Sequence, residues 1–333
     1  MISKALRIIV KLALLGWRIP LFFYIYVRLS SILNPYVQKQ SYKICRVILQ
    51  LIKISGTNTI WISGTGRLIA FGKSYCLYFP MGKLSCTSLE RSISSYEQLS
   101  HSHSGLQHLV DYSYSKVVDP VPHYRCDTLM VPNHDTSPAA HIPILASLSK
   151  LGHSDRAPTG LFSNALDNLR PLVSAHVHSF WLSRVATLAK HRWNIGPLHG
   201  DLTRENIMIN TIGQLVFIDL DRFCWKGIQD FDCIHFEIER WCKNHQTDWF
   251  IFMDKFLFPK EYGHRREPLP FTFDKKSDRS IEKYFDMYFL LRVFLEGSRV
   301  DLDLVPASWL EKVAKHAEAR VPARGRSTIE RGG

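Results

Sequence analysis

A segment just past the middle of the chain places acidic and amide side chains at a spacing suited to phosphoryl transfer. The residues are Asp201, Asn206 and Asp219. Carboxylate and amide oxygens are the hard ligands that Mg²⁺ prefers, so Asn206 and Asp219 are candidates to hold Mg²⁺ on the phosphates of ATP. Asp201 is the candidate base that orients and deprotonates an attacking hydroxyl group. The pattern predicts an ATP- and Mg²⁺-dependent transfer of phosphate to a hydroxyl group.

The residues between these polar groups predict the element that positions them. Apolar runs at 207–209 and 215–218 flank a turn at 210–214, which contains Gly213. This pattern is typical of a β-hairpin. A hairpin brings its two ends side by side, so we expect the two metal-ligand candidates to lie close together.

The complete motif resembles that of a known enzyme group. Residues 199–206 read His-Gly-Asp-Leu-Thr-Arg-Glu-Asn, and 218–222 read Ile-Asp-Leu-Asp-Arg. Together they resemble the kinase-like superfamily, within it the aminoglycoside phosphotransferase and choline kinase branch. The version at 219–222 is most similar to the metal-site motif of lipopolysaccharide core sugar kinases.

The resemblance implies a role for each matching residue. Asp201 would be the catalytic base, and Asn206 and Asp219 would be the metal ligands. His199 would support the catalytic loop. Asp232, further along the chain, resembles a later family aspartate that braces this loop.

The part of the chain that would bind the nucleotide departs from the kinase pattern. Kinases carry a lysine in the third strand that contacts the nucleotide phosphates. The strand expected at 75–79 contains no lysine, and Lys73 and Lys83 lie on either side of it. Backbone groups of Met130 and Val131, at the expected hinge, would meet the adenine. The missing lysine leaves a pseudokinase as the alternative.

The expected elements place strands before helices along the chain. We expect strands at 59–63, 67–71, 75–79, 109–112 and 128–131, and helices at 87–100, 139–151 and 169–190. The predicted fold class is α+β, a two-lobed protein-kinase-like fold preceded by amphipathic helices. A small β-rich lobe at 57–132 is expected before a larger helical lobe at 133–320, which holds the catalytic loop, and a flexible basic tail at 321–333.

The N-terminal part carries the whole net charge of the protein. Residues 1–89 contain 7 Lys, 5 Arg and no acidic residue, which equals the net charge of +12. Residues 1–56 predict basic amphipathic helices, whose mixture of aromatic and basic residues favours contact with an anionic membrane surface through residues 1–54. The alternative is two ordinary helices that pack their apolar faces on the core. No stretch is long enough to span a membrane, and no nucleic-acid motif is present.

The cysteines and the motif together suggest a compartment and a function. The 7 cysteines include no Cys-x-x-Cys pair, which argues against a disulfide framework and for a reducing compartment. We expect a cytoplasmic protein, peripheral on the membrane if its N-terminal helices bind lipid. The leading prediction is a phosphotransferase for a hydroxyl group of a small molecule or glycan, with a membrane-linked sugar preferred. The alternative is a pseudokinase scaffold at the membrane for a partner in glycan assembly.

Overall fold

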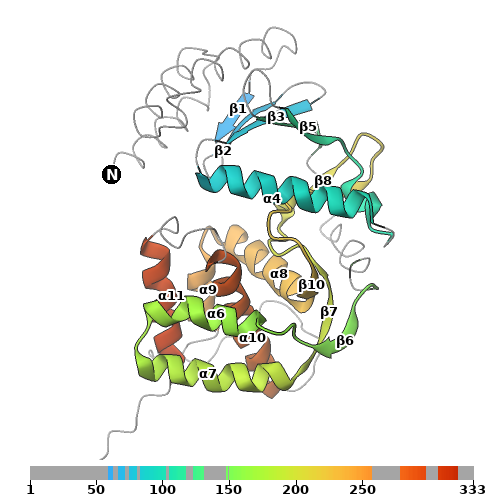
Figure 1. The fold of residues 1–333 in the computed structure, drawn as a ribbon. Coiled ribbons are helices and arrows are strands. Elements are labelled where there is room, and N and C mark those ends of the chain that lie inside the picture. Colours follow the sequence, from blue (N-terminus) through green and yellow to red (C-terminus); the bar gives the residue numbers. More distant parts are fainter. Residues whose placement is uncertain are drawn as a thin grey trace, which may run out of the picture. The chain divides into compact units, whose positions relative to one another are not determined.

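The chain divides into two compact units, each with helices and antiparallel strands (Figure 1). One unit comprises residues 1–147 and 205–223, and the other comprises 148–204 and 224–333. The expected hairpin therefore belongs to the first unit, whereas its place in the sequence had put it in the helical lobe. The computed structural model describes residues 59–62, 67–71, 75–80, 83–102, 105–117, 123–130, 148, 150–256, 278–297 and 307–321.

The first unit is built on a five-stranded antiparallel sheet with the order β1-β2-β3-β5-β4. Its strands are β1 (Thr59–Ile62), β2 (Arg67–Phe71), β3 (Tyr75–Pro80), β4 (Tyr114–Val117) and β5 (His123–Asp127). The first three confirm the strands predicted from short β-rich runs separated by glycine turns. β1 pairs antiparallel with β2, and β2 pairs antiparallel with β3, so these three strands are neighbours in sequence order.

Helix α4 (Lys83–Ser100) packs against this sheet and begins earlier than the predicted residue 87. The predicted start was wrong because serine and threonine residues were interpreted as helix caps. Four serines instead recur on the buried face of the helix at spacings of three and four residues. They are Ser85, Ser88, Ser92 and Ser95. Small side chains on this face let the helix lie close to its neighbours.

Two further strand predictions in the first unit were wrong. The apolar run at 109–112 contains the last two residues of a 3₁₀ helix, η1 (Gln107–Val110), and strand β4 begins only after the run, at Tyr114. The run at 128–131 lies beyond the end of β5, and Met130 makes only an isolated bridge to Ile209. Both runs are short and apolar, a pattern that does not separate a strand from another buried segment.

The predicted hairpin is confirmed. β8 (Ile207–Ile209) pairs with β9 (Leu215–Phe217), and Gly213 in the turn has a φ of 83°, a left-handed conformation that glycine adopts readily. Asn210 closes the turn, because its side-chain oxygen accepts the amides of Ile212 and Gln214 at 3.1 and 2.9 Å. Tyr112 fixes the hairpin within the unit by donating its hydroxyl to the Phe217 carbonyl at 2.8 Å.

The second unit contains a three-stranded antiparallel sheet in the order β10-β7-β6. Its strands are β6 (His153–Arg156), β7 (Arg192–Leu198) and β10 (Cys224–Ile228). β7 ends where the loop that carries His199, Gly200 and Asp201 begins, so the central strand of this sheet positions that loop.

Helices make up most of the second unit. They are α6 (Leu161–Leu169), η2 (Arg170–Leu172), α7 (Ala175–Lys190), α8 (Asp230–Asn244), α9 (Trp249–Phe256), α10 (Asp278–Gly297) and α11 (Ala307–Ala319). The continuous helix predicted at 169–190 was wrong. The helix ends after η2, which contains Pro171, and a new helix, α7, begins with Ser174 as its cap. The core is dominated by α10, whose Phe289 stacks on Trp181 of α7 at a centroid distance of 4.8 Å.

Several predictions fall on residues outside those that the structure describes. They are the helices at 1–56, residues 139–147 of the helix predicted at 139–151, the lobe boundary after residue 132, and residues 322–333 of the tail. Among the described helices, none has the length and apolar character needed to cross a membrane.

Candidate active site

The loop that carries the candidate base Asp201 leaves β7 as a tight turn braced by one carboxylate. The backbone amides of His199 and Gly200 donate to the two oxygens of Asp232, at 2.7 and 2.9 Å. Gly200 has a φ of 81°, which permits the sharp turn before Asp201. Asp232 lies in the first turn of α8, fully buried, where the resemblance places the bracing aspartate. Burial raises the pKa of Asp232, while the charge of His199 and the two amide bonds oppose the rise.

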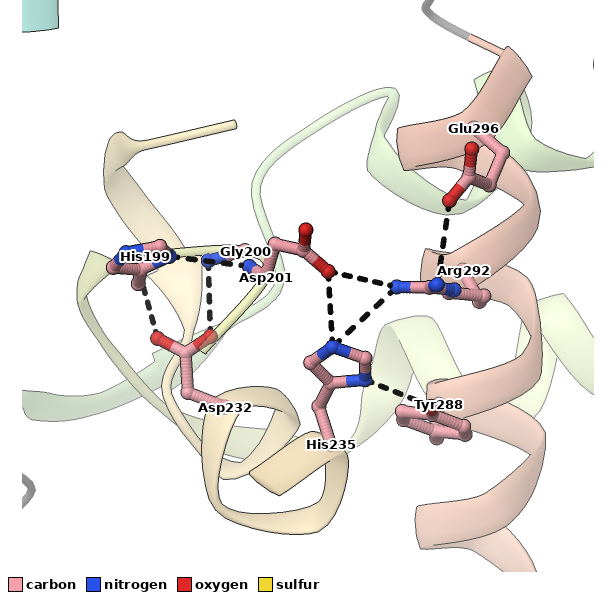
Figure 2. Close-up of polar contacts among 8 residues, drawn as sticks. All are labelled: His199, Gly200, Asp201, Asp232, His235, Tyr288, Arg292 and Glu296. Atoms are coloured by element: carbon pink, nitrogen blue, oxygen red, sulfur yellow. Dashed lines mark hydrogen bonds and ion pairs between the residues drawn. The ribbon is translucent and has the colours of Figure 1, made fainter. Parts of the chain in front are cut away.

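Asp201 is held from behind by a histidine and an arginine (Figure 2). Its Oδ1 accepts from Nε2 of His235 at 3.0 Å and from Nη1 of Arg292 at 3.3 Å. The side chain of His235 is fully buried, whereas that of Asp201 is 25% exposed. The carboxylate is therefore fixed on its protein side while part of it stays open to solvent, which suits a base that must meet an external hydroxyl group.

The residues behind Asp201 form a continuous polar network along α10. Nδ1 of His235 lies 3.0 Å from the hydroxyl of Tyr288, and Nη2 of Arg292 lies 3.4 Å from Oε1 of Glu296. Donation from Nε2 to the Asp201 carboxylate leaves Nδ1 of a neutral imidazole to accept the tyrosine hydroxyl. Burial alone would lower the pKa of Arg292, but Glu296, Tyr288 and Asp201 raise it, so the guanidinium stays charged.

Sequence reasoning missed both residues that hold Asp201. A signal for His235 was present, because it follows Asp232 by three residues and so shares its face of α8. A signal for Arg292 was its position within the otherwise apolar run 287–295, because a charge among apolar residues needs a partner if it is buried. The identity of the partner depends on the fold and could not be read from either position.

The metal-ligand candidates lie at the open end of the hairpin in the first unit. The Ile218 amide donates to the Asn206 carbonyl at 3.0 Å, so Asp219 follows directly after a residue bonded to Asn206. The structure thus brings the two candidates together as the hairpin pattern predicts. Asp219 has a φ of 59°, a left-handed conformation that few residues other than glycine adopt. Such backbone outliers cluster at functional sites.

Asp219 is paired with an arginine that sequence reasoning also missed. Nη1 of Arg67, the first residue of β2, donates to Oδ1 of Asp219 at 2.6 Å. Nη2 of the same guanidinium lies 3.6 Å from Oδ2 of Asp221. The hydroxyl of Ser88, on α4, accepts a hydrogen bond from Nη2 of Arg67 and donates one to Oδ2 of Asp221. Burial and the neighbouring charge of Asp219 raise the pKa of Asp221 to about 6.

The donor set suits a Mg²⁺ ion shared with phosphate groups. Among the residues described, no group of three or more His, Cys, Asp and Glu side chains gathers in a way that could hold a metal ion by itself. Mg²⁺ commonly takes one or two protein carboxylates and completes its shell with phosphate and water oxygens. The amide of Asn206 and the carboxylate of Asp219 fit that requirement.

The remaining predicted nucleotide residues receive less support. The backbone amide of Met130 donates to the carbonyl of Ile209 at 2.8 Å, and the amide of Ile209 donates to the carbonyl of Met130 at 2.7 Å. These backbone groups pair with the hairpin, and the adenine contact expected for Met130 stays a prediction. Val131 and Lys73 lie outside the described residues, as does the side chain of Lys83, although its backbone begins α4.

Comparison with known proteins finds similar solved structures. The GDP complex of wild-type aminoglycoside 2'-phosphotransferase-IIIa has a TM-score of 0.47 and 15% identity, covering 85% of this chain and 99% of that one. A choline/ethanolamine kinase family protein from Mesorhizobium loti has a TM-score of 0.46 and 16% identity, covering 83% and 95%. Choline kinase LicA from Streptococcus pneumoniae has a TM-score of 0.46 and 15% identity, covering 84% and 99%.

No family model matches the chain, and no curated protein matches it.

Proposed function

We propose that this protein is an ATP-dependent phosphotransferase that moves the γ-phosphate of ATP to a hydroxyl group of a small molecule or glycan. The observation that carries the proposal is the setting of Asp201. Its carboxylate is fixed by a buried histidine and a charged arginine, on a loop braced by Asp232, and remains partly exposed. A surface aspartate with no chemical task would not need this support.

In the proposed reaction, Asp201 orients the acceptor hydroxyl and takes its proton. The hydroxyl oxygen forms a bond to the γ-phosphorus as the bond from that phosphorus to the bridging oxygen breaks, and ADP leaves. Arg292 favours the ionised form of Asp201 and makes it a weaker base. A weak base suffices, because phosphoryl transfer proceeds through a loose transition state in which positioning matters most.

Asn206 and Asp219 are proposed to hold the Mg²⁺ ion that neutralises charge on the phosphates. Their oxygen atoms are the ligand type that the ion prefers. The left-handed backbone at Asp219 and the bond between Ile218 and Asn206 keep the two groups together at the end of the hairpin. An amide and a carboxylate leave room for phosphate oxygens in the coordination shell.

The acceptor proposed here is a sugar hydroxyl at an anionic membrane surface. The excess of basic residues at 1–89, where all of the net charge of +12 resides, supports the anionic surface. The resemblance of residues 219–222 to the motif of lipopolysaccharide core sugar kinases supports the sugar. The full-length protein should sediment with vesicles containing phosphatidylserine and not with pure phosphatidylcholine vesicles at moderate salt. Equal behaviour with both vesicle types would remove the membrane from the proposal and leave the phosphotransferase.

A pseudokinase scaffold is the second candidate, favoured by the absence of lysine from β3. The experiment that separates the two follows labelled γ-phosphate from Mg·ATP into lipid-glycan, small-molecule and protein fractions of a host-cell extract. The wild type is compared with Asp201→Asn and with the control Asp167→Asn, which changes an exposed aspartate on α6. Label that is lost in Asp201→Asn and retained in Asp167→Asn supports the kinase. Label in no fraction, with folded protein, supports the scaffold.

A further inference from the structure

Arg67 is a buried cation to which the phosphotransferase chemistry described above assigns no role. It is the one lysine or arginine within strands β1, β2 and β3. Its register partner is Pro80, at the end of β3. The cation therefore lies beside the strand in which the kinase pattern expects a lysine.

The partners of Arg67 are two carboxylates at the end of the hairpin. Its guanidinium donates to Asp219 at 2.6 Å and lies 3.6 Å from Asp221, with Ser88 bonded to both Arg67 and Asp221. Asp219 is also the proposed ligand of a divalent cation. The guanidinium of Arg67 thus contacts an oxygen of the Asp219 carboxylate, which is the proposed ligand of the divalent cation.

Charge balance makes this arrangement unfavourable for a divalent cation alone. Asp219, Asp221 and Arg67 sum to a charge of −1, where the two carboxylates alone would supply −2. A divalent cation on Asp219 would also lie close to the buried guanidinium of Arg67, and partial burial of the site strengthens the repulsion between like charges. The repulsion is relieved only if Arg67 gains another anion.

The phosphate groups of a nucleotide are the anions that fit. The planar fork of arginine matches phosphate oxygens as well as carboxylate oxygens, and it remains charged at all accessible pH values. A nucleoside diphosphate also brings more negative charge than the two aspartates provide. It therefore satisfies Arg67 and the divalent cation at the same time.

We propose that Arg67 exchanges partners. It pairs with Asp219 and Asp221 in the nucleotide-free protein, and it binds the phosphate groups of a nucleoside di- or triphosphate when a divalent cation binds at Asp219. In this way it supplies the charge that a strand lysine supplies in the kinase pattern. It also disfavours a divalent cation without a nucleotide. This inference rests on the proposed function, because it takes ATP as the substrate.

A purely structural role for Arg67 predicts a different result. If the ion pairs only hold β2, α4 and the hairpin together, removing Arg67 should loosen the site and weaken every ligand alike. Partner exchange predicts effects of opposite sign for the metal and the nucleotide. Adenosine, which has no phosphate groups, should be indifferent to Arg67 under partner exchange.

The test measures three ligands on the full-length protein by calorimetry: Mn²⁺ alone, Mg·ADP and adenosine. The variant is Arg67→Gln, and the matched control is Arg125→Gln, which removes an exposed cation from β5 of the same sheet. For Arg67→Gln we expect Mn²⁺ to bind at least about 3-fold more tightly and Mg·ADP at least about 10-fold more weakly, with adenosine unchanged. The control should match the wild type for all three.

The results that would overturn partner exchange differ from the result that would overturn the proposed function. Unchanged Mg·ADP affinity in Arg67→Gln, or equal weakening of ADP and adenosine, overturns partner exchange. A wild type that binds no Mg·ADP overturns the proposed function itself. If Arg67→Gln does not fold, Arg67→Lys keeps the charge but loses the fork. It should then weaken Mg·ADP by about 3-fold or more without affecting adenosine, and any other result overturns partner exchange.

Discussion

His235 Nε2 lies 3.0 Å from Oδ1 of Asp201, so a buried imidazole on α8 holds the proposed base through a single hydrogen bond. The imidazole is itself oriented by the hydroxyl of Tyr288, 3.0 Å from its other nitrogen. A base held in this way keeps one orientation of its carboxylate, and orientation is the main contribution a protein makes to phosphoryl transfer.

The first prediction concerns this bond. His235→Ala removes the donor and leaves space in which the Asp201 carboxylate can rotate, so we expect the rate of labelled phosphate transfer to fall about 10- to 100-fold. His235→Gln retains an N–H donor and should recover part of that rate. Mg·ADP affinity, measured by calorimetry, should stay within about 2-fold of the wild type in both variants, because neither touches the nucleotide residues. A loss of ADP affinity equal to the loss of rate would contradict a positioning role.

The second prediction concerns the charge beside the base. Arg292 lies 3.3 Å from Asp201 and favours its ionised form, so Arg292→Gln should raise the pKa of the Asp201 carboxyl. Transfer requires the ionised carboxylate, and the acid limb of the pH–rate profile should therefore move to higher pH. Glu296→Gln removes the counter-charge of Arg292 and should leave the acid limb in place or move it to lower pH. A limb that stays fixed in Arg292→Gln would show that Arg292 does not tune the base.

The third prediction concerns the brace of the catalytic loop. Asp232→Asn leaves one oxygen to accept two buried amides, and an unsatisfied buried amide costs about 1–3 kcal/mol. We expect the urea midpoint of unfolding to fall accordingly, with a loss of transfer activity as the loop loosens. An unchanged midpoint would exclude the brace.

The same variant has a predictable pH dependence. Burial raises the pKa of Asp232, so the folded protein binds that proton more tightly than the unfolded chain. The contribution of Asp232 to stability is therefore greatest below its unfolded pKa, about 3.9, and declines as the pH rises toward the folded pKa. The stability of the wild type relative to Asp232→Asn should decrease over that interval in urea titrations at several pH values.

Local patterns were enough to predict the hairpin, because two short apolar runs and the glycine turn between them lie within a dozen residues. The first three strands follow from the same kind of signal. The start of α4 was placed too late, because Thr87 and Ser88 have types typical of caps, whereas both lie inside the helix and Ser88 is buried. Only the folded unit shows whether such a serine caps a helix or is buried inside one.

The sequence predicted the site residues that belong to the motif, but not the residues that pair with them. Asp201, Asn206 and Asp219 stand at recognisable spacings in one stretch of sequence. Arg67 is separated from Asp219 by 152 residues, and Arg292 is separated from Asp201 by 91. No periodicity relates positions so far apart, and the ion pairs arise from the packing of β2 and α10 within their own units.

The final prediction concerns the stability of the second unit, away from the proposed base. Asp286 on α10 is buried and accepts from Nε of Arg184 on α7 at 2.5 Å and from Nη2 of Arg320 at 2.9 Å. Asp286→Ala would leave two guanidinium groups without their shared anion, and breaking a buried ion pair from one side costs about 3–5 kcal/mol. Urea unfolding should show a loss of that size.

The control for this prediction is an exposed ion pair in the same unit. Asp248 bonds Lys312 at 2.7 Å, with both side chains nearly half exposed. Burial alone would raise the pKa of Asp248, but hydrogen bonds from Lys312 and from the Ile251 amide lower it. Asp248→Asn should cost less than about 1 kcal/mol, because water screens an exposed pair. Equal losses for Asp248→Asn and Asp286→Ala would contradict the view that the buried aspartate anchors α7 and the chain beyond α11 to α10.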